Sequence, residues 1–143
     1  MIEAAFDVRH RLQKHDLQSF VKTTGGKGLH VVLPLQPGPD WDTVKRFAQA
    51  TAESMAAERP DRYVANMAKR VRQGRIYIDY VRNGMGATAV GAYSTRARAG
   101  AAVSTPLSWD EIGPGIRAVF TTNMYGATAA FMDRFPKLGI IST

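Results

Sequence analysis

The chain has 143 residues, of which 45% are hydrophobic, and it contains no cysteine. These values fit one folded domain spanning residues 1–143 and exclude disulfides and thiolate metal sites, so a metal would need oxygen or imidazole ligands. Nineteen lysines and arginines against 12 acidic residues give a net charge of +7, which favours a polyanionic partner but also fits a solubilising surface. No apolar run approaches the roughly 18 residues of a membrane span, and the N-terminus lacks a signal-peptide pattern, so we expect a cytoplasmic protein without a membrane partner.

The first part of the chain predicts two helices separated by a pair of strands. Residues 1–15 mix apolar and basic side chains at helical spacing. Two runs rich in β-branched residues, 19–24 and 29–35, predict strands joined by a tight turn around the glycines between them. After a proline-rich turn, Asp40 can cap a helix that Pro60 ends.

The second part predicts further helices and strands in alternation. We expect a helix over residues 61–73 with Met67 on its inner side, and strands over 75–81 and 87–93. Ser108-Trp-Asp-Glu111 has the spacing of a capping box, and a last helix is expected over about 124–135. Helices interspersed with short strands predict an α/β or α+β fold, in which helices flank a mixed or antiparallel sheet.

The loop Gly25-Gly26-Lys27-Gly28 separates the first two predicted strands. Its spacing matches neither a Walker A loop nor a dinucleotide fingerprint. Glycines nevertheless let backbone amides approach an anion closely, and Lys27 adds positive charge. The residues alone leave two interpretations open, an anion-binding cradle or a flexible hairpin loop with an exposed lysine. By itself His30, in the second strand, fits packing as well as ligand binding.

Asp79 stands in the middle of the predicted strand 75–81, where aspartate is unusual and a buried carboxylate needs a compensating cation. The residues leave two interpretations open here, an ion pair with one of the many arginines, of which Arg75 shares the strand face, or a metal ligand. Arg82, Arg96 and Arg98 follow the predicted strands, where their guanidinium groups either grip phosphate oxygens or form a solvated basic edge.

Three long segments together resemble one family, the primase-polymerase domain of bacterial ligase D in the archaeo-eukaryotic primase superfamily. The segments are SFVKTTGGKGLHVVLPL, RYVANMAKRVRQGRIYIDYVRN and GATAVGAYSTRARAGAAVSTPLSWDEI, in that order. The resemblance covers roughly residues 1–120 and leaves 121–143 as a divergent tail. It implies the C-terminal part of the primase-polymerase fold. It also implies template-dependent nucleotide addition at DNA ends in non-homologous end joining.

The resemblance also implies roles for individual residues. Asp79 matches the family's aspartate that binds Mn²⁺ or Mg²⁺, and with His30 it would be a catalytic residue. The residues that the resemblance places on the phosphates of an NTP or dNTP are Thr24, Gly26, Lys27, Gly28, Ser94 and Arg96. Arg82 and Arg98 would contact DNA or phosphate.

One departure from the family concerns its upstream Asp-x-Asp pair, which supplies two further metal-binding carboxylates and which this sequence lacks. Three readings follow. The chain is a domain fragment that binds nucleotide and DNA ends but does not polymerise alone, one half of a split polymerase, or a non-catalytic nucleic-acid or nucleotide-binding remnant. Expected partners are DNA ends, NTP or dNTP, a DNA-ligase or end-binding protein, and a chain carrying the missing half. The expected location is the bacterial cytoplasm at the nucleoid, with self-association left open.

Overall fold

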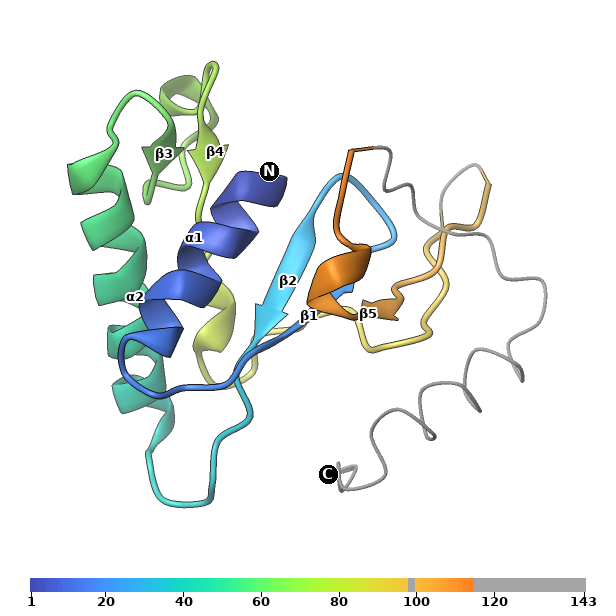
Figure 1. Ribbon diagram of the computed structural model, residues 1–143, viewed down its shortest axis with the longest axis horizontal. Helices are drawn as coiled ribbons and strands as arrows, with labels where there is room; N and C mark the ends of the chain where they lie inside the picture. The colour runs from blue at the N-terminus through green and yellow to red at the C-terminus, as the bar shows by residue number, and fades with distance from the viewer. Residues whose placement is uncertain (98–99, 115–143) are drawn as a thin grey trace. The chain divides into compact units, whose positions relative to one another are not determined.

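The computed structural model describes residues 1–97 and 100–114, which combine helices with short strands in a mixed α/β fold (Figure 1). This is the fold class that the sequence predicts. The contacts gather in two units. Unit 1 comprises Met1–Ser19 and Val31–Ala89, and unit 2 comprises Phe20–His30 together with the described residues from Val90 onward. In the described part of the chain, no helix is both long enough and apolar enough to cross a bilayer.

Unit 1 contains helices α1 (Ile2–Gln13) and α2 (Trp41–Glu58), close to their predicted positions. Helix α2 begins where the sequence predicts because the Asp40 side chain accepts a hydrogen bond from the Thr43 N–H at 2.7 Å. Such a bond satisfies one of the amides that the first helical turn leaves without a partner.

The core of unit 1 is formed where α1, α2 and two short strands meet. Strands β3 (Tyr63–Val64) and β4 (Ile76–Tyr77) pair in parallel, with Tyr63 opposite Ile76. Met55 of α2 is 0% exposed and packs with Ala4 and Tyr63, and partly buried Ile76 and Ile78 pack against this cluster.

Polar contacts also join these elements. The Tyr63 hydroxyl donates a hydrogen bond to the Asp7 carboxylate, which also accepts one from Arg59 at 3.3 Å. Burial and the Asp7 carboxylate together raise the pKa of Tyr63 to about 12. The Tyr63 ring therefore packs in the core while its hydroxyl is hydrogen-bonded to Asp7 of α1.

The predicted helix over residues 61–73 is wrong. Tyr63 and Val64 are buried in β3, and the Ile76 and Ile78 amides donate to the Arg62 and Val64 carbonyls. Only Lys69–Val71 form a short 3-10 helix. Apolar residues at helical spacing misled the prediction because one of them, Val64, is buried together with Tyr63 by pairing with a strand further along the chain, a tertiary effect that overrides local pattern.

The predicted strands over 75–81 and 87–93 also differ from the structure. The first is limited to Ile76–Tyr77, and residues 87–93 form no strand. The predicted helix over 124–135 lies outside the described residues.

Unit 2 contains a three-stranded sheet in the order β2-β1-β5. Strands β1 (Phe20–Thr23) and β2 (Leu29–Val32) flank the glycine loop as predicted, and β2 continues into unit 1. Strand β5 (Pro106–Leu107) runs antiparallel to β1, with Val21 opposite Leu107. The predicted capping box is confirmed at the 3-10 helix Trp109–Glu111.

Candidate functional site

The glycine loop is a closed turn between β1 and β2. The Thr24 hydroxyl donates to the Gly28 carbonyl at 3.0 Å and accepts from the Gly28 N–H at 3.2 Å, while the Thr24 N–H donates to the same carbonyl at 3.1 Å. Gly25 has a φ of 63°, a left-handed conformation that glycine adopts without steric cost. Thr24 therefore closes the loop, and its hydroxyl proton is already engaged with Gly28.

Arg96 lies directly against this loop. A Cβ atom placed on Gly25 would stand 2.7 Å from the Arg96 Cγ and 2.9 Å from the Ala102 carbonyl oxygen, so only glycine leaves room. Arg96 is held there by its own N–H, which donates to the Ala102 carbonyl at 2.9 Å, and by the antiparallel bridge between Thr95 and Val103. The structure thus brings together the glycine loop and the arginine segment, which are far apart in the sequence.

The side chains of this region carry positive charge. Lys27 and Gly26 are exposed at the tip of the loop, and Arg96 is half-buried beside it. Within the described part of the chain, Lys27 makes no hydrogen bond or ion pair. The exposed tip of the glycine loop and two nearby cations form an arrangement suited to an anion with several oxygens, such as a phosphate chain. His30 lies on β2 and is half-buried.

Ser94 lies two residues before Arg96, at the end of a turn. The Tyr93 N–H donates to the Ser104 carbonyl at 2.6 Å, and the Ser94 carbonyl accepts from the Ser104 N–H at 3.0 Å. Ser94 is exposed. The other predicted residue of this segment, Arg98, lies outside the described residues.

Asp79 belongs to unit 1 and does not lie within a strand, so this part of the prediction is wrong. It follows β4, where its carboxylate accepts hydrogen bonds from the Val81 N–H at 3.0 Å and the Tyr77 hydroxyl at 3.4 Å. Aspartate favours such a local turn because its side chain can bond the amide two residues further on. The carboxylate is partly exposed, so the cost of a buried charge does not arise.

The cation beside Asp79 is Arg82 rather than Arg75, with 3.3 Å between Arg82 Nε and an Asp79 oxygen. Arg82 also donates to the Thr88 carbonyl at 2.8 Å. Arg75 instead donates to the Pro60 and Val71 carbonyls. The predicted ion pair of Asp79 with an arginine is therefore present, but with a different partner.

A complete divalent-metal site is absent from residues 1–97 and 100–114, because no three acidic or histidine side chains there could hold a metal ion together. Asp79 offers a single carboxylate, and that group already faces a guanidinium. Mg²⁺ and Mn²⁺ require several oxygen ligands. The described residues by themselves therefore do not fit the metal that the family resemblance implies.

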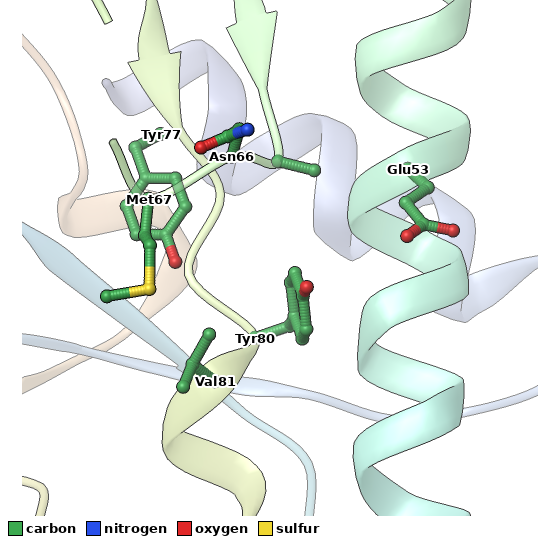
Figure 2. A pocket seen from close by; sticks show the side chains of 7 residues that line it. Glu53, Asn66, Met67, Tyr77, Tyr80 and Val81 are labelled. Carbon is green, nitrogen blue, oxygen red and sulfur yellow. The ribbon is translucent and has the colours of Figure 1, made fainter. Parts of the chain in front are cut away.

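A cavity of about 360 Å³ lies in unit 1, beyond the ends of β3 and β4 (Figure 2). Its lining includes Asn66, Met67, Tyr77, Tyr80 and Val81, with Glu53 reaching it from α2. Met67, predicted to point inward, is 63% exposed, and Val81 is 38% exposed. The hydrogen bond from Tyr77 to Asp79 connects this partly apolar hollow to the candidate metal ligand.

Sequence reasoning missed two residues, Lys22 and Ser104, that join strand β1 to the segment that carries Arg96. Lys22 Nζ donates to the Val90 carbonyl and to Ser104 Oγ, the latter at 3.3 Å. A lysine within an apolar strand next to the loop was a signal for Lys22. Nothing in the local sequence around Ser104 indicates that it is fully buried.

Comparisons with known proteins give a consistent result. The family described as LigD, primase-polymerase domain, matches residues 1–133. The multifunctional non-homologous end joining protein LigD of Pseudomonas aeruginosa is 44% identical over 112 residues, which make up 78% of this chain and 13% of that protein. The bifunctional non-homologous end joining protein LigD of Bacillus subtilis is 27% identical over 140 residues, which make up 96% of this chain and 22% of that protein.

A solved structure is also similar, the polymerase domain from Mycobacterium tuberculosis ligase D in complex with DNA. It matches with a TM-score of 0.80 and 27% identity over 96% of this chain and 46% of that one. The chain therefore spans less than half the length of the solved domain and less than a quarter of the length of the two relatives.

Proposed function

Because this chain belongs to the LigD primase-polymerase domain family, we propose that it acts in DNA repair by non-homologous end joining, by binding a nucleoside triphosphate and DNA ends. The observation that carries this proposal is the contact between Gly25 and Arg96, which brings two predicted phosphate-binding segments to one place in unit 2. The net charge of +7 supports a polyanionic ligand.

For the triphosphate, we assign the charge to Lys27 and Arg96 and a backbone donor to Gly26. The Gly28 N–H donates to the Thr24 hydroxyl, so Gly28 must exchange that bond when it contacts a phosphate. Arg96 offers a planar fork of N–H groups that matches two phosphate oxygens, whereas Lys27 acts as a point charge. Ser94 and His30 complete the set of phosphate contacts, and His30 retains its proposed catalytic role. Thr24 contributes chiefly by closing the loop.

For DNA, the proposal draws on the solved polymerase domain, whose structure contains DNA. Arg82 and Arg98 are the proposed contacts to DNA or phosphate, with a DNA-ligase or end-binding protein as further partner. Arg82 must then exchange or share its ion pair with Asp79 when it binds a phosphate.

Catalysis needs more carboxylates than the described residues bring together, so we propose that the chain does not polymerise by itself. Asp79 remains the proposed ligand for Mn²⁺ or Mg²⁺, with the other ligands supplied by another part of a primase-polymerase domain.

One half of a split polymerase is the second candidate function, and the cavity beside Asp79 favours it. Met67 and Val81 expose apolar surface there, and such surface marks interaction sites when it is contiguous. A partner that covered this hollow would reach the neighbourhood of Asp79, where the missing carboxylates are needed. Template-dependent nucleotide addition by the isolated chain would count against both this candidate and the non-polymerising fragment.

The triphosphate site predicts a selective loss of nucleotide affinity in two variants. Lys27→Ala and Arg96→Ala should each weaken binding of a fluorescent NTP by at least about tenfold at fixed salt, because each removes a charged donor to phosphate. The control is Lys14→Ala, which removes an exposed lysine of unit 1 and should leave the affinity unchanged. Equilibrium titration followed by fluorescence anisotropy measures all three.

Equal losses in Lys27→Ala and Lys14→Ala would contradict a specific site. In that case the affinity should also fall steeply with salt for all variants, as expected for a diffuse basic surface.

A further inference from the structure

Lys22 is a cation of unit 2 that the proposed function leaves without a role. It lies in strand β1, three positions before the first residue of the glycine loop, Gly25, and is partly buried. Its ammonium donates to the main-chain carbonyl of Val90 and to the hydroxyl of Ser104. Burial lowers its pKa below the usual lysine value, which agrees with an ammonium turned into the protein rather than toward solvent.

Ser104, which accepts a hydrogen bond from Lys22, also joins strand β1 to the Tyr93–Ser94 turn. It is 0% exposed, and its hydroxyl donates to the Thr23 carbonyl at 2.7 Å. Its backbone bonds the Tyr93–Ser94 turn in both directions, accepting from the Tyr93 N–H and donating to the Ser94 carbonyl. A buried serine with partners on three sides fixes these segments against one another.

The segments that Lys22 contacts lead directly to Arg96. Residues 90–97 and 100–105, here called the arginine arm, are joined by the Thr95–Val103 bridge and by the bond from Arg96 N–H to Ala102. Lys22 donates hydrogen bonds to both ends of the arginine arm, to Val90 at its start and to Ser104 near its end. The position of the Arg96 backbone beside Gly25 therefore depends on both attachments.

We propose that Lys22 is a positioning residue, whose ammonium ties the arginine arm to strand β1 and so places Arg96 beside the glycine loop. It is not a phosphate ligand in this assignment, because two of its three N–H donors are committed to Val90 and Ser104. The consequence for nucleotide affinity rests on the proposed function, whereas the consequence for the arm does not.

The test of positioning is amide hydrogen exchange in Lys22→Met, a side chain of similar length without the charge. The amides of Tyr93, Arg96 and Ser104 should exchange about 10- to 100-fold faster, because a partly buried carbonyl and hydroxyl lose a charged donor. Amides of helix α2 should not change. The matched control is Lys27→Met, which removes the exposed loop lysine and should leave exchange in the arm unaltered.

A double-mutant cycle on NTP affinity tests how Lys22 acts. Lys22→Met should weaken binding by about tenfold when Arg96 is present and by less than about twofold in an Arg96→Ala background, since positioning matters only while Arg96 is there. Additive losses would instead make Lys22 a direct phosphate ligand and overturn the assignment.

Restoring the charge provides a further control, because the chain has no cysteine of its own. Lys22→Cys, alkylated with 2-bromoethylamine in denaturant and refolded, regains an ammonium at the length of lysine. Both slow exchange in the arm and nucleotide affinity should return. Unchanged exchange in Lys22→Met would refute the positioning role whatever the nucleotide result, whereas faster exchange in a protein that binds no NTP would refute only the proposed function.

Discussion

Gly25→Ala is expected to abolish measurable NTP binding, while Gly28→Ala in the same loop retains it. At Gly25 a methyl group meets both the Arg96 side chain and the Ala102 backbone, and the φ of 63° adds about 1–2 kcal/mol for a residue with a Cβ atom. Alanine therefore forces the loop and the arginine arm apart. At Gly28 the nearest atoms to a new methyl group belong to Thr24 at 3.4 Å, an ordinary contact.

Gly74→Ala separates backbone strain from crowding. Gly74 has a φ of 68°, close to that of Gly25, but a Cβ there meets nothing within 4 Å. It lies in unit 1, so its substitution should lower stability modestly without changing NTP affinity. Titration of the three variants against a fluorescent NTP distinguishes the causes. If Gly25→Ala binds as well as Gly74→Ala, the Gly25–Arg96 contact is not part of a nucleotide site.

Local signals predicted much of the fold correctly because their chemistry is local. Asp40 caps α2 through an amide three residues away, and Ser108 with Glu111 forms its box within one turn. The strand pair around the glycine loop is likewise closed by Thr24 and Gly28, four residues apart. Such patterns need no knowledge of the rest of the chain.

The failed predictions concern residues whose environment comes from elsewhere in the chain. The spacing of Val64 with Met67, Ala68 and Val71 predicts a helix, but Tyr63 and Val64 form a strand because β4 pairs with them. Asp79 was placed mid-strand because residues 75–81 alternate, but β4 ends at Tyr77 and the Asp79 carboxylate accepts from the Val81 N–H in the turn that follows.

In the candidate site, too, local motifs were predicted and long-range contacts were missed. The resemblance predicts that the glycine loop and Arg96 belong to one site, and the contact at Gly25 supports that prediction without testing any role. Lys22 and Ser104 were missed because their bond joins residues 82 positions apart, and the local sequence does not show which distant residue Lys22 contacts. Residues that position a site through long-range hydrogen bonds are therefore harder to predict than the sequence motif that forms the site.

Met55→Ala is expected to destabilise unit 1 by about 2–5 kcal/mol, the usual cost of truncating a fully buried methionine. Met55 packs against Ala4 and Tyr63, and the cavity left behind lies where α1, α2 and β3 meet. The matched control is Met85→Ala, whose side chain is 81% exposed and whose loss should change stability by less than about 0.5 kcal/mol. Thermal and urea unfolding followed by far-UV circular dichroism report the change, because α1 and α2 both belong to unit 1. Equal stability of the two variants would contradict the assigned core.

The same substitution separates the two parts of the proposed function. Ile76 and Ile78 pack against the Met55 cluster and lead the chain to Asp79, so a cavity there loosens the segment that carries the proposed metal ligand. The glycine loop instead rests on β1, whose Val21 and Thr23 are buried in unit 2. At temperatures well below unfolding, Met55→Ala should therefore speed exchange of the Ile78 and Val81 amides while NTP affinity stays within about twofold of the unmodified chain. A parallel loss of NTP affinity would mean that the phosphate site depends on the core of unit 1.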